Sequence, residues 1–410
     1  MTRISRVLEE LRRLGGVPYR LIGDIATVVR GASPRPIRNF ITDEDGSVPW
    51  IKIGDVPVGS KYITQTAQRI TVEGAMKSRR VHPGDFVLSN SMSFGRPFIS
   101  KIEGCIHDGW LAISEFDGSL EPNFLYHLLG SPRIQEEFSR RAGVGAVQNL
   151  NADIVKAIAI PCPPIEVQRA IVEVLDLFGS LNTEIQAELE ARRLQYAYYR
   201  DSMFGFTSAA DVSRRPLGDL GQFIRGRRFT KDDVVESGIP SIHYGEIYTH
   251  YGVATESVIS HVRTDLVDQL RYAQPGDVVF AAVGETVEDV AKAVAWLGDE
   301  PVAIHDDTFL FRSELNSKYV SYFAQTGDFH RQKHKHVARA KVNRISGEGL
   351  SKIAIPVPSL GQQERIVDIL DKLNALVSDP SGGLPAEIVA RRTQYEHYRD
   401  RLLTFEELVV

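Results

Sequence analysis

The chain has 410 residues, of which 43% are hydrophobic and 25% are charged, and its formal net charge is −5. These values are typical of globular proteins, and the length is enough for two or more domains, each with a core of its own. The acidic total excludes a uniformly basic nucleic-acid coat but leaves room for a local basic patch. No apolar run approaches the roughly 18 residues of a membrane span, so we expect a cytoplasmic protein.

The N-terminal residues 1–15 form the first predicted element, an amphipathic helix. It lacks the apolar core of a signal peptide. The apolar residues that share one face of this helix are Ile4, Val7, Leu8, Leu11 and Leu14.

From residue 16 onward the sequence repeats itself. The stretch "LIGDIATVVRG" from Leu21 pairs with "PLGDLGQFIRG" from Pro216, at an offset of 195 residues. At the same offset, "AIAIPCPPIEVQRAIVEVLD" from Ala157 pairs with "KIAIPVPSLGQQERIVDILD" from Lys352. The chain is therefore predicted to be a tandem duplication, in which a mixed module and a helical segment each occur twice.

The mixed modules cover residues 16–156 (module 1) and 213–351 (module 2). In both, short β-rich runs such as "DFVLSN" and "DVVFAAV" alternate with glycine and proline turns, and a helical pattern closes the module. This pattern predicts two α+β domains. Because the "GD" turns, the "PGD" turns and the "IAIP" exits recur in order, we expect both modules to have one fold.

The helical segments cover residues 157–212 and 352–410, and a heptad spacing recurs in both. A seam of about three heptads needs a partner surface. We expect the two to pack as an antiparallel coiled coil about a pseudo-twofold axis, with the tyrosines of one helix near those of the other. Alternatively, each helix covers only its own domain. The seam residues are Ile185, Leu189, Arg192, Tyr196, Tyr199 and Met203, then Leu384, Ile388, Arg391, Tyr395, Tyr398 and Leu402.

This order of modules and helices resembles the specificity subunit of type I restriction-modification systems. The resemblance extends over nearly the whole chain and is most specific in "IAIPCPPIEVQRAIVEVLD", "IAIPVPSLGQQERIVDILD", "LPAEIVARRTQYEHYRDRLL" and "SNSMSFGRPFI". It implies a non-catalytic subunit without a cofactor, in which each module is a target recognition domain for one half of a split DNA site. It also implies two methyltransferase subunits and a nuclease-translocase (restriction) subunit as partners.

The helices would be the spacer between the two half-sites. At 1.5 Å per residue, the residues from Asn182 to Phe204 would span about 35 Å, close to one turn of DNA. Their acidic composition disfavours DNA along the helices and suits a protein partner.

In module 2, the most basic window is "HRQKHKHVARAKVNR", which contains no acidic residue. Lysine and arginine clusters contact phosphates first, whereas base reading needs a few side chains in a groove. A solvated helix end is the alternative. The candidate DNA contacts of module 2 are Arg227, Arg228, His243, Tyr244, Lys333, Lys335, Lys341, Asn343 and Arg344.

In module 1, cations precede "LSNSMSFGRPF", and a glycine-rich loop carries Gln148 and Asn149 before the helices begin. Glutamine and asparagine can pair bidentately with adenine, and arginine with guanine. A hinge between domain and helix is the alternative for this loop. The candidate DNA contacts of module 1 are Lys77, Arg79, Arg80, Ser89, Asn90, Arg96, Gln148 and Asn149.

Motifs of catalysis are missing from the sequence. It contains no P-loop, no dinucleotide-binding GxGxxG after a strand, and no NPPY-type tetrapeptide. His330 and His334 have the spacing of metal ligands, but no third ligand is indicated. We interpret "HD" at His107 and His305 as structural turns. The competing hypotheses are a protein-interaction scaffold without DNA preference and an enzyme of unrecognised type.

Overall fold

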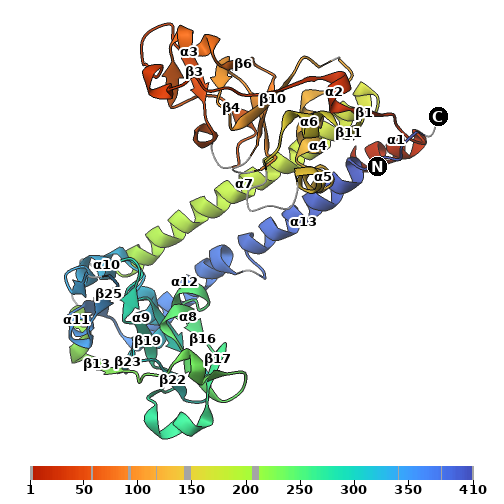
Figure 1. The fold of residues 1–410 in the computed structure, drawn as a ribbon. Coiled ribbons are helices and arrows are strands. Elements are labelled where there is room, and N and C mark those ends of the chain that lie inside the picture. Colours follow the sequence, from red (N-terminus) through yellow and green to blue (C-terminus); the bar gives the residue numbers. More distant parts are fainter. Residues whose placement is uncertain are drawn as a thin grey trace. The chain divides into compact units, whose positions relative to one another are not determined.

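The computed structural model describes residues 3–56, 59–90, 94–116, 118–142, 149–205, 212–339, 341–379 and 381–408. These residues divide into two compact units, drawn in Figure 1. Unit 1 comprises Met1–Glu184 and Ile388–Val410, whereas unit 2 is the continuous segment Ile185–Glu387. Unit 1 is therefore built from two pieces of chain that are distant in sequence.

Unit 1 contains two main sheets and one strand pair. The five-stranded sheet has the order β2 (Thr27–Arg30), β10 (Trp110–Ser114), β7 (Phe86–Ser89), β8 (Pro97–Ser100) and β4 (Tyr62–Ile63). The four-stranded sheet has the order β5 (Gln68–Ile70), β3 (Val48–Ile51), β9 (Gly104–Ile106) and β6 (Arg79–Val81). The pair is β1 (Tyr19–Leu21) with β11 (Ala159–Pro161).

Unit 2 has corresponding sheets and one more. The first five-stranded sheet has the order β13 (Gly221–Arg225), β23 (Thr308–Ser313), β19 (Val278–Ala281), β21 (Ala293–Trp296) and β16 (Ala254–Thr255). The second has the order β14 (Val234–Val235), β17 (Ser260–Val262), β15 (Ile239–Ile242), β22 (Val302–Ile304) and β18 (Tyr272–Ala273). The others are β20 (Val283–Gly284), β25 (Asn343–Ile345) and β24 (Val337–Ala338), and the pair β12 (Ser213–Pro216) with β26 (Ala354–Val357).

The two modules share one topology, as the recurring turns predict. In module 1, β3 pairs with β9 and β4 pairs with β8 in parallel, while the other strand pairs are antiparallel. In module 2, the corresponding pairs β15–β22 and β16–β21 are also parallel. The prediction of two α+β modules with one fold is therefore confirmed.

The helices of unit 1 include α1, which lies within the predicted N-terminal helix, and the first part of the long helix α7. None of the helices in the described part of the chain is long and apolar enough to cross a membrane. The helices that begin in unit 1, together with α13, are α1 (Arg3–Arg13), α2 (Ile22–Ile25), α3 (Val72–Met76), α4 (Pro122–Leu129), α5 (Pro132–Ala142), α6 (Ala152–Lys156), α7 (Ile165–Met203) and α13 (Leu384–Leu402).

Unit 2 adds α8 (Tyr244–Thr249), α9 (Ser317–Phe323), α10 (Gly327–Lys333), α11 (Gly347–Ser351) and α12 (Leu360–Ser378). The second helical segment is thus two helices, because α12 ends at Ser378, the first residue of "SDPSGGLP", and α13 begins at Leu384, near its end. Proline and glycine disfavour a continuous helix here, as the sequence predicts.

Within unit 1, α13 runs antiparallel to the first part of α7. Phe178 of α7 stacks on Tyr398 of α13, with ring centroids 5.6 Å apart. Phe405, beyond the end of α13, lies 6.3 Å from Phe124, and the helix of Phe124 is bonded at its start to Gln168 of α7. The two helices can be followed in opposite directions in Figure 1. The two helices are therefore antiparallel here, as expected, but the contact is made by the part of α7 that precedes the predicted seam of residues 185–203.

The partners along this contact differ from those expected. Tyr395 and Tyr398 lie against Phe178 in unit 1, whereas the hydroxyl of Tyr196 is 3.5 Å from Oε1 of Gln325 in unit 2. A heptad fixes which face of a helix is covered but not which residue covers it. The partner of Tyr395 and Tyr398 is thus a phenylalanine of α7 and not its tyrosine pair.

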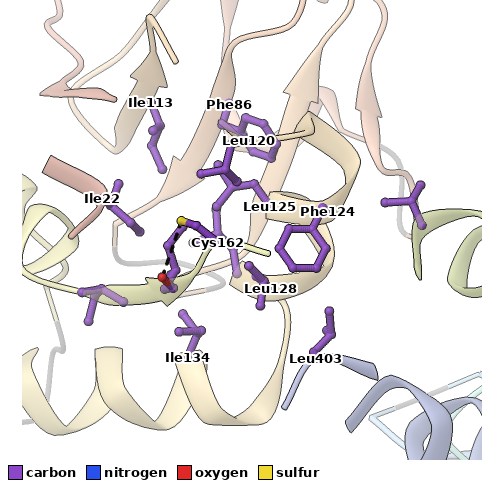
Figure 2. Close-up of a cluster of buried hydrophobic side chains, with 14 of the residues drawn as sticks. Ile22, Phe86, Ile113, Leu120, Phe124, Leu125, Leu128, Ile134, Cys162 and Leu403 are labelled. Carbon is purple, nitrogen blue, oxygen red and sulfur yellow. Dashed lines mark hydrogen bonds between the residues drawn. The ribbon is translucent and has the colours of Figure 1, made fainter. Parts of the chain in front are cut away.

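The largest core of unit 1 joins both of its chain pieces. Figure 2 shows Ile22, Phe86, Phe124 and Leu403 converging in one buried cluster. Next to this core the main chain of Val17 donates to Glu406 O at 2.9 Å and accepts from Leu408 N at 3.0 Å. Residues 388–408 therefore complete the interior of unit 1 and extend its main-chain hydrogen bonding.

Candidate nucleic-acid interface

An open hollow lies on module 2 where the loop after β13 meets the turn between β22 and β23. Its volume is about 410 Å³. It brings together Arg228, His243 and Arg344, three of the candidates predicted from separate stretches of sequence. The residues that line the hollow are Arg225, Arg228, Phe229, Thr230, Lys231, His243, His305, Asp306, Asp307 and Arg344.

Hydrogen bonds fix the wall of this hollow around His305. Its Nδ1 accepts from Asp307 N at 3.1 Å, so its Nε2 carries the proton and donates to Phe229 O, also at 3.1 Å. Arg225 Nε donates to Asp306 O at 2.7 Å, and Arg344 pairs with Asp307 at 3.3 Å. The "HD" turn is thus a structural turn, as we interpreted it, and it positions two arginines.

Free cations remain beside these paired ones. In the part of the chain that the structure describes, Arg227, Arg228 and Lys231 are exposed and their side chains have no partner. They lie on the loop between β13 and β14. Unpaired guanidinium and ammonium groups next to fixed hydrogen-bond donors suit phosphate oxygens and base edges.

His243 lines another side of the hollow, and Tyr244 lies beside it outside the lining. The rings of both residues are half-buried and lie 4.5 Å apart, and His243 caps α8 by accepting from Gly245 N at 3.3 Å. Burial lowers the pKa of His243, and the nearby His305 lowers it further. Because the cap occupies Nδ1, the neutral ring offers its Nε2–H as a donor, which can meet an acceptor on a base edge or a phosphate.

The group His305, Asp306 and Asp307 could hold a metal ion by spacing, because its ligand atoms lie within 4.8 Å of one another. Both ring nitrogens of His305 are already used in hydrogen bonds, however, and both carboxylates face arginines. Metal binding would have to break these contacts. The arrangement is therefore explained by its hydrogen bonds alone.

Module 1 repeats the same turn with other side chains. Arg30 Nε donates to Asp108 O at 3.0 Å, as Arg225 does to Asp306 O. The carboxylate of Asp108 accepts from Ser33 Oγ at 2.7 Å and pairs with Arg35 at 3.2 Å. The Ser33 hydroxyl holds the pKa of Asp108 below its ordinary value. Sequence reasoning missed Arg30, Ser33 and Arg35.

A glycine follows the arginine in both turns because the chain comes too close for a side chain. A Cβ at Gly31 would lie 2.1 Å from His107 O, and a Cβ at Gly226 would lie 2.1 Å from His305 O. In each module, the "RG" motif therefore packs directly against the "IHD" motif, and both motifs recur in the repeat. This repetition was the signal that could have located the missed residues.

Two predicted contacts of module 1 lie in its interior. Ser89 and Asn90 are 0% and 3% exposed, and Asn90 Nδ2 donates to Asp108 O at 3.0 Å. They shape the turn from inside, so the expectation that their polar ends face DNA is wrong. A serine–asparagine pair resembles a surface loop in sequence, whereas here it ends the central strand β7.

The other module 1 candidates are scattered. Lys77 pairs with Glu73 at 2.6 Å and Arg80 with Glu103 at 3.0 Å, while Arg79 is exposed on β6. The guanidinium of Arg96 lies over the ring of Phe98, 5.1 Å from its centroid. Asn149 is exposed, and Gln148 lies outside the described residues.

In module 2 the basic window divides into exposed and buried parts. Lys335, Lys341 and Arg344 are exposed, and Asn343 Nδ2 donates to Glu285 O at 2.8 Å. Lys333 is 0% exposed, and its ammonium bonds main-chain oxygens inside the module. The prediction that Lys333 contacts DNA phosphate is therefore wrong, because a buried ammonium cannot reach a phosphate.

Comparison with known proteins identifies the class to which this fold belongs. The family model of the type I restriction modification DNA specificity domain matches residues 16–191 and again 210–389. The chain therefore belongs to the family of type I restriction-modification specificity proteins. The two matches cover both modules, in agreement with the duplication.

Individual relatives agree with this assignment. A type I restriction enzyme specificity subunit of Escherichia coli, EcoR124I/EcoR124II, is 31% identical over 61% of this chain and 63% of its own length. A putative specificity subunit of Haemophilus influenzae is 26% identical over 97% of this chain and 98% of its own. The chain thus matches less than two thirds of the first relative and nearly all of the second.

Solved structures show the same fold. A chain from a type I R-M system covers 95% of this chain and 97% of its own length, with a TM-score of 0.68 and 16% identity. The HsdS subunit from Thermoanaerobacter tengcongensis covers 95% and 96%, with a TM-score of 0.51 and 16% identity. The two-module architecture with long helices therefore persists at low sequence identity.

Proposed function

We propose that this chain is the DNA-recognition subunit of a type I restriction-modification complex, in which residues 16–156 and 213–351 each read one half of a bipartite site. The observation that best supports this proposal is the turn with a bound arginine that occurs in both modules. Arg30 and Arg225 make the same bond to the residue after the histidine in their own module, and different side chains surround the two turns. One fold with two sets of surface groups suits two different half-sites.

The helices supply the rigidity that such a reader needs. In unit 1, Asp176 of α7 accepts from His127 Nε2 at 2.8 Å and from Lys61 Nζ at 3.1 Å. In unit 2, Asp371 of α12 accepts from the Tyr322 hydroxyl at 2.7 Å. These bonds support a fixed attachment of each module to its helix, so that α7 would set the distance between half-sites.

The partners in this proposal are double-stranded DNA, two methyltransferase subunits and a restriction subunit, in the cytoplasm where cellular DNA lies. The chain itself would be non-catalytic, in keeping with its relatives, which are specificity subunits. A scaffold without DNA preference and an enzyme of unrecognised type remain the alternatives, but family membership favours neither.

The deciding experiment is to produce the chain with the products of its genomic neighbours and to sequence the methylated DNA. We expect one adenine-methylated motif with two specified halves and an unspecified spacer. Methylation without any sequence preference would favour the scaffold, and methyl transfer by the isolated chain would favour the enzyme. Either result would contradict the proposal.

A further inference from the structure

Lys333 lies at the end of α10, inside module 2, where no solvent reaches its side chain. Its Nζ donates to Glu288 O at 2.7 Å and to Val290 O at 2.6 Å. Burial lowers the pKa of this ammonium group to about 8. Burying a cation is costly, so a lysine at this position needs an explanation. Its two bonds hold the main chain of the segment that contains Glu288 and Val290.

That segment is the loop of residues 285–290 (the braced loop), which connects β20 to β21. Lys333 holds its second half, and Asn343 Nδ2 holds its first residue at Glu285 O, 2.8 Å away. Strand β20 pairs with β25 at Gly284 and Asn343. The braced loop is thus fixed beside the strand that carries Asn343 and Arg344.

The exposed carboxylates of the braced loop are hydrogen-bond acceptors. Glu285, Thr286 and Glu288 are exposed, and the carboxylate of Glu288 is 3.7 Å from His334. The side chain of Glu285 has no partner within the described part of the chain. Close to DNA phosphates, a free carboxylate is repelled unless it meets a hydrogen-bond donor, and cytosine and adenine present amino groups in the major groove.

We propose that the braced loop is a base-reading loop of module 2, that Glu285 accepts a hydrogen bond from a base amino group, and that Lys333 is the positioning residue that holds the loop in place. This inference rests on the proposed function. It assigns to Lys333 an indirect part in specificity, exerted through the main-chain oxygens of Glu288 and Val290.

Module 1 holds the corresponding loop from the corresponding helix. Gln135 of α5 donates to Gly95 O at 2.9 Å, and Leu150 N donates to Asn90 O at 2.8 Å, as Ile345 N donates to Ala282 O at 2.9 Å. The residue that precedes Lys333 by the repeat offset of 195 is Phe138, which is buried. The charged brace is thus particular to module 2, and Gln135 offers a matched control.

The test uses the full chain in complex with its methyltransferase, and compares Lys333→Met, Lys333→Arg and Gln135→Leu by sequencing the methylated sites. Lys333→Met keeps most of the length of the side chain but loses its donors. We expect it to reduce the preference at one or more positions of the module 2 half by at least about fivefold, the lower end of what one base contact gives. The module 1 half and the affinity for nonspecific DNA should not change.

Lys333→Arg keeps two donors and should retain the sequence preference of the module 2 half. If Lys333 only filled space, Lys333→Arg would have no advantage over Lys333→Met. Gln135→Leu should alter only the module 1 half. A folded Lys333→Met complex that reads both halves as the wild type does would overturn the inference, as would equal losses in Lys333→Met and Lys333→Arg.

Glu285→Ala tests the loop without disturbing the interior, because this side chain is exposed. It should lower the preference at a single module 2 position by at least about fivefold, and no change would overturn the inference even if Lys333→Met failed to fold. A wild-type complex without any bipartite motif would instead contradict the proposed function, so the two failures can be told apart.

Discussion

Gln168 and Gln363 are fully buried side chains that make the same hydrogen bonds in different units. Oε1 of Gln168 accepts from Glu121 N at 2.8 Å, and Oε1 of Gln363 accepts from Asn316 N at 3.0 Å. Nε2 of each donates to a proline oxygen five residues earlier, at 2.8 and 2.9 Å respectively. Each glutamine thus joins the start of a helical segment to the N-cap residue of a module helix, Glu121 before α4 and Asn316 before α9.

We expect Gln168→Met and Gln363→Met to destabilise their own units. The substitution leaves at least two buried main-chain groups without partners, at about 1–3 kcal/mol each, so a loss on the order of 2–6 kcal/mol in the free energy of unfolding is expected. Hydrogen exchange resolved along the chain would measure it. Increased exchange confined to Met1–Glu184 and Ile388–Val410 is expected for Gln168→Met, and a uniform increase would contradict the prediction.

The exposed lysines of module 2 should contribute affinity without sequence preference. Replacing Lys335 and Lys341 by alanine should weaken DNA binding for all sequences and lower the slope of log K against log salt by up to about one unit per lost phosphate contact. Lys352→Ala, which removes a lysine paired with Glu348 on α11, is the charge-matched control. Equal effects of all three lysines would argue against a localised DNA face.

Arg344 should read a base, because Asp307 holds it at the rim of the hollow. Arg344→Ala should relax one position in the module 2 half and cost about 1–3 kcal/mol in discrimination. Arg344→Lys, which keeps the charge but not the fork of donors, should retain affinity and lose most of the preference. The measurement is a motif survey of methylated DNA. A change in the half-site assigned to module 1 would contradict the hypothesis that the two modules read DNA independently.

The stability of the protein should depend on pH through Lys333. Burial lowers its pKa from 10.5 to about 8, so between these values the unfolded chain keeps a proton that the folded protein has lost. The unfolded state then binds more protons, and the free energy of unfolding rises with pH across this window, by about 3 kcal/mol in total. Urea unfolding at about pH 7 and about pH 10 should show this rise relative to Lys333→Met. A constant difference between the two proteins would exclude it.

The length of α7 should set the spacer of the DNA motif. Inserting seven residues after Glu184, two helical turns, would keep the heptad face and lengthen the helix by about 10 Å. With about 3.4 Å per base pair, we expect a spacer that is longer by up to about three base pairs, with both specified halves unchanged. An unchanged spacer in an active complex would exclude α7 as the ruler.

The sequence was sufficient for the duplication, the shared module fold and the heptad faces, because repeats and periodicity are visible in a single chain. It was not sufficient for the partners of those faces. Phe178 meets Tyr395 and Tyr398, a register that depends on how the whole of α13 fits into unit 1. Register is a property of tertiary packing, which a seven-residue period does not determine.

The candidate site was predicted in part. Arg228, His243 and Arg344 do come together, because polar and basic residues on loops tend to lie at the surface. Lys333 was misjudged because "HRQKHKH" is uniformly polar and basic, and only the repeat offset to Phe138 marks the position as an interior one. Ser89 and Asn90 were misjudged in a similar way, since polar residues at the end of a buried strand are recognised only once the strand is placed.

The main-chain bonds between Val17 and residues 406–408 have a consequence for the order in which the protein matures. Unit 2 is continuous in sequence, so all of it has been translated before unit 1 receives Ile388–Val410. A ribosome-bound chain can therefore complete module 2 while the unit that holds module 1 still lacks a helix and part of its interior. Module 1 is translated first but should be the last to become resistant to proteases. This order reverses the usual N-terminal-first direction of folding during synthesis.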